Sequence, residues 1–274
     1  MKRLVSALGR MAPMRLKRFL LGTQQDEGSW IARTFHNALN RIPGDRFPCL
    51  PCSGILGGYR MRLDWYNNRS YSYGTWETDV VDVLREVVRE GFVAYDVGAH
   101  IGYYALILSK LVGPSGRVVS FEPVPSSYSF LAENIRMNHL TQAEAYNMAV
   151  TDRLGKLRFN IPSDVPFPVG ASFQEGTGAG GVEVEATSID EFMREREKRL
   201  DFLKVDAEGA EDRVLKGACS AIHANHPIIM VEIHHFDGEI GHSTVPDLLH
   251  SWGYELRKLD QGVTTSHFLA TWKG

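Results

Sequence analysis

The stretch FVAYDVGAHIG at residues 92–102 constrains the fold more than any other part of the chain. Residues 92–95 form a short apolar run that predicts a buried strand, with Asp96 at its end. Gly98 and Gly102 then bracket a tight turn, and YYALILSKLV follows with helix-like apolar spacing. A strand, a glycine-rich turn and a helix in this order bring backbone N–H groups close to a nucleotide-like ligand.

A carboxylate follows the next predicted strand. Residues 117–121 are expected to form that strand, and Glu122 after it can accept hydrogen bonds from both hydroxyls of a ribose. The spacing G-x-x-x-G lacks one glycine of the G-x-G-x-x-G clamp for a pyrophosphate, and Asp96 would repel that anion. An acidic residue suits a ligand with an amine and a sulfonium, so the pattern favours S-adenosylmethionine over a nicotinamide dinucleotide.

The composition indicates an ordinary globular chain. Its 274 residues can form one sizeable α/β core with an extension, and 43% of them are hydrophobic and 23% charged. The net charge of −3 gives no reason to expect nucleic acid as a partner. No apolar run approaches the roughly 20 residues that a membrane span needs.

The first 25 residues differ from the rest because they contain six basic residues and no acidic one. Such a segment suits an amphipathic helix that touches a membrane or an acidic carrier protein, but a solvated helix packed on the body is the simpler interpretation. Cys49 and Cys52 form a lone C-x-x-C, and no second pair completes the four ligands of a usual zinc site. The low cysteine count predicts a reducing, cytoplasmic location.

From residue 76 onward, predicted strands alternate with predicted helices until the last two strands. This alternation predicts a parallel sheet with helices on both faces, and the final pair, 254–259 and 266–272, would form an antiparallel edge. Residues 162–181 interrupt the pattern with a long loop rich in proline and glycine. A loop of this length is expected to be a substrate-facing lid or a disordered segment.

The chain resembles the FkbM-type S-adenosylmethionine-dependent methyltransferases in four segments: DVGAHIGYYAL, FEPVPSSYSFLAENIRMN, FLKVDAEGAEDRVLKGA and IIMVEIHH. The resemblance covers about residues 73–272, and KVDAEGAEDRVLKG is its most specific part. It implies a Rossmann-like seven-stranded sheet and, in most characterised members, O-methylation of hydroxyls as varied as those of macrolides and sugars. The domain organisation expected from it is an N-terminal extension at 1–72 and a methyltransferase domain at 73–274.

The expected cofactor site lies at the carboxyl ends of the parallel strands. The residues assigned to the methionine part are Asp96, Gly98, His100 and Gly102, with Glu122 for the ribose and Asn147 and Ala149 beside the adenine. His100 departs from the family, which commonly has asparagine there. Tyr73, Trp76 and Glu77 precede the first core helix and either cover the cofactor or simply pack.

The candidates for catalysis follow the fourth and fifth strands of the sheet. They are Asp206, Glu208, Glu211, Glu232, His234 and His235, of which Asp206, Glu208 and His234 are assigned to catalysis. In one mechanism His234 or Asp206 is the general base that takes the proton of an acceptor hydroxyl. In the other, Asp206, Glu232 and His234 hold a divalent ion such as magnesium. The base without a metal is favoured, and the charges of Glu208 and Glu211 also suit a plain helix N-terminus.

The acceptor is expected to be a hydroxylated small molecule. Enzymes that methylate an exocyclic base amine or a glutamine have an Asn/Asp-Pro-Pro-aromatic turn where this chain has Asp-Ala-Glu-Gly at 206–209. Two alternatives stay open. A nicotinamide-dependent dehydrogenase would lack its third glycine and a Tyr-x-x-x-Lys pair, and a non-catalytic binding module would keep the fold as a scaffold.

Overall fold

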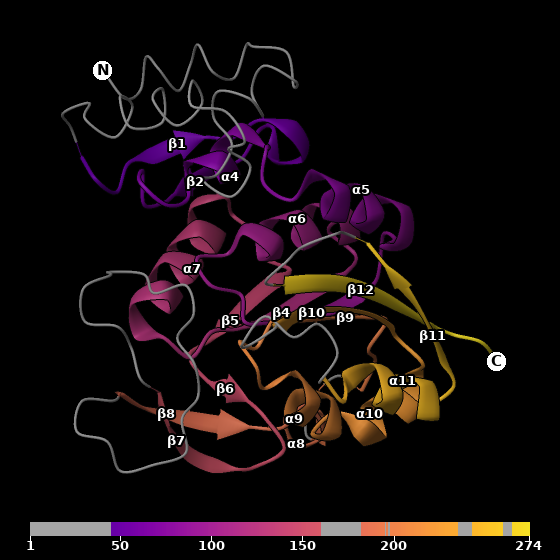
Figure 1. Cartoon of the computed structure of the whole chain (residues 1–274). Helices are drawn as coiled ribbons and strands as arrows, with labels where there is room; N and C mark the ends of the chain where they lie inside the picture. The colour runs from indigo at the N-terminus through magenta and orange to yellow at the C-terminus, as the bar shows by residue number, and fades with distance from the viewer. Residues whose placement is uncertain (1–44, 160–181, 195, 197, 235–242, 260–264) are drawn as a thin grey trace.

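A seven-stranded sheet crosses the middle of the molecule in a computed structural model that describes residues 45–159, 182–194, 196, 198–234, 243–259 and 265–274 (Figure 1). The strand order is β11-β12-β10-β9-β3-β4-β5. The strands span β3 (Val93–Val97), β4 (Arg117–Phe121), β5 (Ala143–Tyr146), β9 (Phe202–Val205), β10 (Ile228–His234), β11 (Tyr254–Lys258) and β12 (Thr265–Trp272).

The sheet is parallel from β10 to β5, and β12 is antiparallel to both β10 and β11. The predicted Rossmann-like sheet with an antiparallel C-terminal edge pair is therefore confirmed, with β12 inserted between β11 and β10. The chain runs outward from β3 through β4 to β5 and then returns to the other side of β3 with β9. The strand order thus reverses between β3 and β9, which is where open α/β sheets form a ligand crevice.

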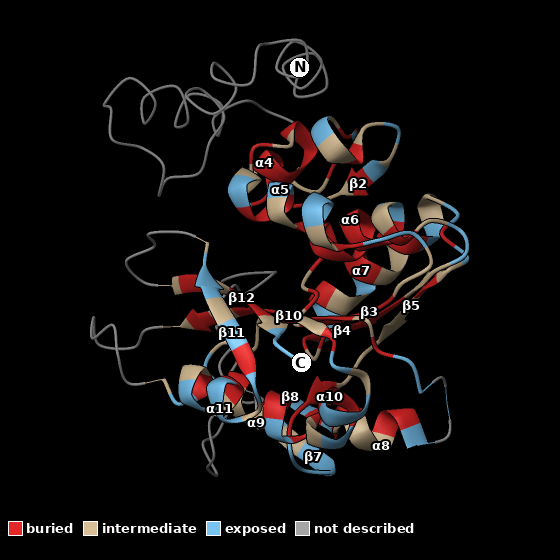
Figure 2. Cartoon of the chain, turned by 90° about the vertical axis from the view of Figure 1, so that its right-hand side faces the viewer, coloured by how far each residue is buried: buried red, intermediate tan, exposed pale blue. Residues whose placement is uncertain are grey.

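Helices cover both faces of this sheet (Figure 1). On one face lie α4 (Arg69–Tyr73), α5 (Thr78–Val87), α6 (Tyr103–Val112) and α7 (Pro125–Met137), and on the other lie α8 (Ile189–Arg194), α9 (Glu211–Lys216), α10 (Cys219–Asn225) and α11 (Val245–Ser251). Each layer buries its apolar side chains against the sheet, so the core consists of two large hydrophobic clusters, one on each face (Figure 2).

Two smaller sheets flank the main one. The pair β1 (Cys49–Pro51) and β2 (Arg60–Arg62) joins the core on the α6 and α7 side, and both residue 50 and residue 61 are fully buried there. The second small sheet has the order β6-β8-β7, with bounds Ala149–Val150, Val182–Thr187 and Gly155–Phe159. The predicted lid at 162–181 and the basic segment at 1–25 lie outside the described residues.

The observed bounds of the elements agree closely with the predicted ones where turn-forming residues flank an element. The helix at 103–112 and the strand at 117–121 have the predicted bounds. The first core strand runs to Val97 instead of ending at Asp96, because β4 and β9 pair with it on both sides as far as Val97. None of the helices in the described residues has both the length and the apolar character to cross a membrane.

Candidate active site

The turn between β3 and α6 fits tightly against the end of β9. The N–H groups of Gly98 and Ala99 both donate to the carbonyl oxygen of Phe121, at 3.0 and 2.9 Å. Gly98 has a φ of +77°, and a Cβ there would lie 1.8 Å from the carbonyl oxygen of Asp206. Only glycine therefore satisfies both the conformation and the space. This close approach brings the start of the predicted cofactor turn beside the predicted catalytic residue on the next strand.

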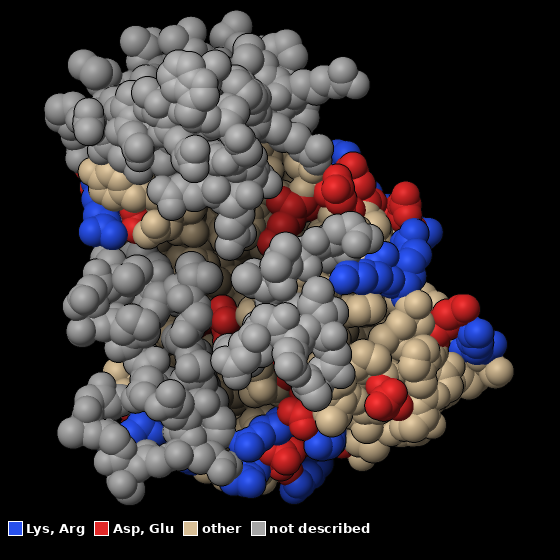
Figure 3. Space-filling model, viewed as in Figure 1, with Lys and Arg blue, Asp and Glu red and all other residues tan. Residues whose placement is uncertain are grey.

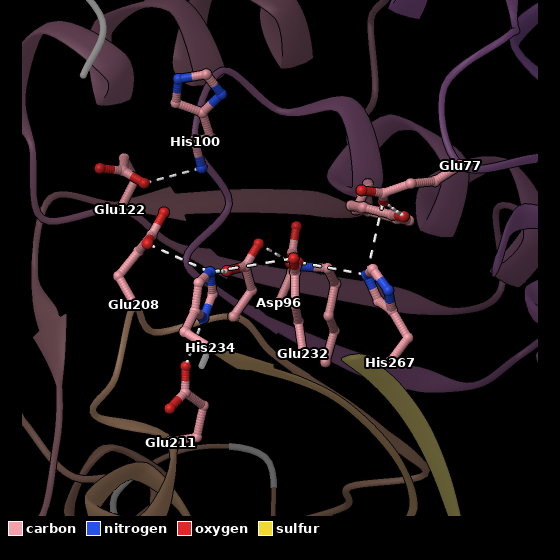
Figure 4. Close-up of polar contacts among 12 residues, drawn as sticks. Glu77, Asp96, His100, Glu122, Glu208, Glu211, Glu232, His234 and His267 are labelled. Atoms are coloured by element: carbon pink, nitrogen blue, oxygen red, sulfur yellow. Dashed lines mark hydrogen bonds and ion pairs between the residues drawn. The ribbon is translucent and has the colours of Figure 1, made fainter. Parts of the chain in front are cut away.

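Glu122 fastens the same turn to the end of β4. Its carboxylate accepts hydrogen bonds from the N–H groups of His100 and Val124, each at 2.8 Å. Burial raises the pKa of Glu122 to about 7, and these two hydrogen bonds oppose the shift. The imidazole of His100 points away from this carboxylate (Figure 4), and burial lowers its pKa to about 4. The structure thus brings His100 and Glu122 together through the backbone of one and the side chain of the other.

The two residues predicted beside the adenine follow β5. The side-chain amide of Asn147 donates to the carbonyl oxygens of Glu122 and Pro123, at 2.8 and 2.9 Å, so it ties the segment after β5 to the segment after β4. Ala149 begins β6, and its side chain packs with Val184 in the small three-stranded sheet.

Asp96 is the least satisfied polar group of the site. Its side chain has no exposed surface, and neither carboxylate oxygen has a hydrogen-bond partner among the described residues. The Nζ atom of Lys204 lies 3.8 Å away. Burial raises the pKa of Asp96 to about 6, while Lys204 acts to lower it. A buried carboxylate without hydrogen bonds is costly, so its retention beside a glycine turn points to a ligand that completes it.

His234 occupies the centre of the predicted catalytic group (Figure 4). Its Nδ1 lies 2.9 Å from Glu211, its Nε2 lies 3.2 Å from Glu208, and Asp206 and Glu232 are at 3.9 and 4.0 Å. Burial alone would lower the pKa of His234, but these carboxylates raise it to about 9. His234 is therefore an imidazolium at neutral pH, and it joins carboxylates from the end of β9, the start of α9 and β10. His235 lies outside the described residues.

Asp206 itself has a raised pKa, because burial outweighs the opposing effect of Lys204. Its side chain retains partial exposure of 24%, whereas that of Asp96 is fully covered. Asp206 is thus the more accessible of the two carboxylates that face Lys204. Of the two carboxylates, Asp206 is therefore the better placed to accept the proton of an acceptor hydroxyl.

The sequence pattern did not assign three residues to this site, or it assigned them another role. Lys204 is buried on β9 two positions before Asp206, and a lysine inside the apolar run FLKV is the signal that could have revealed it. His267 lies directly opposite Glu232 in the β10–β12 pair, with 3.3 Å between Nε2 and the carboxylate. Glu77, at the start of α5, accepts a hydrogen bond from the hydroxyl of Tyr104 and lies 3.8 Å from His267.

These contacts give Glu232 a partner on either side. Burial would raise the pKa of Glu232, but the contact with His267 and the positive charges nearby lower it to about 2. Two overlapping groups, Asp206–Glu232–His234 and Glu77–Glu232–His267, have the ligand types of a divalent ion. In the first group, however, Lys204 already lies 3.1 Å from Asp206 and both nitrogens of His234 face carboxylates. These residues fit a network in which an ammonium and an imidazolium partly compensate the carboxylates better than they fit a metal centre.

The charges outside the site are mixed in sign. On the face seen in Figure 3, Lys and Arg side chains alternate with Asp and Glu over the described surface. This pattern matches the near-neutral net charge of −3.

Comparison with known proteins gives a consistent result. The family model of the methyltransferase FkbM domain matches residues 96–256. The chain is 31% identical to the hexuronic acid methyltransferase AglP of Haloferax volcanii over 58% of this chain and 62% of that protein. It is 28% identical to the 31-O-demethyl-FK506 methyltransferase FkbM of Streptomyces tacrolimicus over 56% and 70%.

A solved structure, the methyltransferase FkbM of Methylobacillus flagellatus, is also similar, with a TM-score of 0.45 and 18% identity, over 87% of this chain and 59% of that one. The chain spans about three fifths of the length of the curated relatives that it matches first. The family model covers more than half of the 274 residues and includes every strand of the sheet that contributes to the site except β12 and the start of β3. The chain therefore belongs to the FkbM methyltransferase family.

Proposed function

We propose that this chain is an S-adenosylmethionine-dependent O-methyltransferase that methylates a hydroxyl of a small molecule, a sugar or a natural product. The observation that carries the proposal is the buried Asp96 carboxylate, which has no hydrogen-bond partner among the described residues and adjoins the glycine turn. An ammonium group is the natural complement of such a carboxylate. Family membership and the names of the relatives, two of which act on a hexuronic acid and on a 31-O-demethyl compound, support the reaction type.

The residues at or just beyond the ends of β3, β4 and β5 would bind different parts of the cofactor. When bound, S-adenosylmethionine supplies a methyl carbon activated by a sulfonium. Asp96 would bind its ammonium, with Gly98, His100 and Gly102 shaping the turn around the methionine part. Glu122 would accept hydrogen bonds from the ribose hydroxyls, and Asn147 and Ala149 would lie beside the adenine.

On the acceptor side, Asp206 would take the proton of the acceptor hydroxyl. His234 carries a proton up to a pH of about 9, so in this form it would orient Asp206 and Glu208 as an imidazolium instead of removing a proton itself. As a base, the assignment that the sequence favoured equally, His234 would have to lose its proton to Glu208 or Glu211 first. Positioning of acceptor and methyl group would supply much of the rate.

The decisive measurement is isothermal titration of the purified protein with S-adenosylhomocysteine, alongside NADH and NADPH. We expect binding of S-adenosylhomocysteine alone, and its loss in Glu122→Ala. Binding of a nicotinamide cofactor instead would establish the dehydrogenase alternative. Binding without turnover of any hydroxylated acceptor would support the non-catalytic module.

Asp96→Asn sharpens this test because it removes the charge and keeps the shape. The buried carboxylate costs stability, so Asn is expected to leave the melting temperature equal or higher while weakening binding of S-adenosylhomocysteine at least about tenfold. Asp212→Asn is the matched control, since Asp212 on α9 forms an ion pair with the exposed Lys216. Equal affinity in Asp96→Asn and Asp212→Asn would remove the main support for the proposed function.

The metal alternative has its own test. We expect exhaustive chelation to leave the rate of methyl transfer unchanged, because Lys204 and His234 already supply positive charge to Asp206. The measurement compares initial rates before and after chelation and after magnesium is restored. A rate that falls on chelation and returns with magnesium would favour the Asp206–Glu232–His234 metal centre. The cytoplasmic location and the absence of nucleic acid as a partner stay predictions of the sequence.

A further inference from the structure

Lys204 is a buried charge in an otherwise apolar strand. It is 2% exposed and lies on β9 between β3 and β10, where its neighbours in sequence, Leu203 and Val205, belong to the hydrophobic core. Burial of an ammonium is costly unless other groups pair with it. Lys204 therefore depends on the groups that pair with it for its place in the core.

The contacts of Lys204 join the two halves of the proposed site. Its Nζ atom lies 3.1 Å from Asp206 and 3.8 Å from Asp96, and 4.7 Å from the centre of the Tyr104 ring. The pairing register places Lys204 opposite Asp96, while Asp206 follows two residues later and so projects from the same face of the strand. Burial would lower the pKa of Lys204, but the charges of Asp206 and Asp96 hold it above its usual range.

The two carboxylates do not share the ammonium equally. Lys204 donates a hydrogen bond to Asp206, whereas the oxygens of Asp96 have no hydrogen-bond partner in the described part of the chain. Lys204 thus orients the more exposed carboxylate and leaves the fully buried one available to a ligand. The Lys204 ammonium therefore lies within ion-pair distance of Asp96, on the side of the methyl donor, and of Asp206, on the side of the methyl acceptor.

We propose that Lys204 is a positioning residue for methyl transfer, which keeps Asp206 ionised and oriented and couples it to the cofactor carboxylate Asp96. This inference rests on the proposed function, since Asp206 and Asp96 have their roles from it. The charged groups that face Asp206 are Lys204 at 3.1 Å, His234 at 3.9 Å and Glu232, which opposes both cations. Two consequences follow. Removal of the Lys204 ammonium, the nearer cation, raises the pKa of Asp206, and removal of the Asp206 charge lets Lys204 turn fully to Asp96.

The first consequence is tested with Lys204→Met, Lys204→Arg and, as the matched control, Lys156→Met, which removes an exposed lysine paired with Glu183. Titration of ¹³C-labelled aspartate by NMR, with the Asp206 signal assigned from Asp206→Asn, reports its ionisation without any turnover. In Lys204→Met we expect the Asp206 midpoint to rise by about one pH unit or more. Lys204→Arg and Lys156→Met should keep the midpoint of the wild type. An unchanged midpoint in Lys204→Met would overturn the proposal.

Kinetics and binding separate positioning from mere packing. In Lys204→Met the acidic limb of kcat/KM should move upward with the Asp206 midpoint. Removal of the ammonium also raises the pKa of Asp96, so binding of S-adenosylhomocysteine is measured across the pH range. At a pH at which Asp96 is ionised in the variant, S-adenosylhomocysteine should bind as in the wild type or more tightly, because no ammonium competes for Asp96. Loss of both binding and activity at every pH tested would show that Lys204 only supports the fold.

The second consequence needs no change at position 204, so it holds even if Lys204→Met does not fold. Asp206→Asn should weaken S-adenosylhomocysteine binding severalfold, although Asp206 has no assigned contact with the cofactor. Unchanged affinity in Asp206→Asn would refute the coupling. If the wild-type protein bound no S-adenosylhomocysteine at all, the proposed function would fail, and the NMR titration would still decide whether Lys204 controls the ionisation of Asp206.

Discussion

Gly98 links the proposed cofactor turn to the end of β9 through a contact that tolerates no side chain. Its Cβ would meet the Asp206 carbonyl oxygen at 1.8 Å and its φ is +77°, whereas Gly155, with a φ of +112°, has open space around it. Gly155→Ala should cost about 1–2 kcal/mol from backbone strain alone, and Gly98→Ala about twice that or more because the backbone must also move. Chemical denaturation measures both. Equal losses would show that β9 yields readily at this point.

His234 makes the stability of the protein depend on pH. Its folded pKa of about 9 exceeds the ordinary value of 6.5, so its contribution is complete below pH 6.5 and disappears as the pH rises through 9. The contribution amounts to about 3 kcal/mol at most. Glu211→Gln, which removes the nearest charge, should lower the pKa of His234 and flatten the fall in unfolding free energy between pH 6.5 and 9. Parallel pH profiles in wild type and variant would contradict this.

At the scale of single residues, the sequence predicted proximity better than protonation. Asp96, Gly98, Glu122 and Asp206 lie close together as expected, because all four lie at or just beyond the carboxyl ends of neighbouring parallel strands. The imidazolium state of His234 was not foreseeable, since it depends on carboxylates from several elements that meet only in three dimensions.

At the scale of elements, local sequence signals predicted where helices and strands begin and end, but they did not predict which distant strands pair. Gly113-Pro114 ends α6 and Glu122 follows β4, so their bounds were predictable. The insertion of β12 beside β10 is a pairing between distant segments, and only that register brings His267 opposite Glu232. A strand pattern alone does not specify its neighbour.

The turn and the strand ends that surround Asp96 should respond together to ligand. We expect S-adenosylhomocysteine to slow hydrogen exchange of the amides at 97–103 and 121–124, because a bound ligand favours the closed form of local opening equilibria. The edge strand β11 serves as the internal control and should exchange at its original rate. Uniform protection across both regions would indicate general stabilisation instead of a local site.

For the molecule as a whole, the boundary predicted at residue 72 can be tested by cooperativity. Trp65 is fully buried in the same hydrophobic cluster as residues of α6 and α7. Trp65→Ala should therefore cost about 3–5 kcal/mol and shift one single unfolding transition of the entire described core. The check is calorimetry with a fluorescence probe in parallel. Two separate transitions, with only the smaller one shifted, would support 1–72 as an independent extension.

The position of β12 has a consequence for biosynthesis. This strand leaves the ribosome after every other strand of the sheet, yet it belongs between two that precede it. Until it arrives, β10 presents an unpaired edge of mostly apolar residues, the kind of surface on which nascent chains associate. His267 also comes opposite Glu232 only when β12 pairs with β10. Pairing of β12 with β10 thus covers the exposed strand edge and places His267 beside Glu232 in the same step. A nascent chain therefore completes the charged residues of the site only when the edge of β10 is covered.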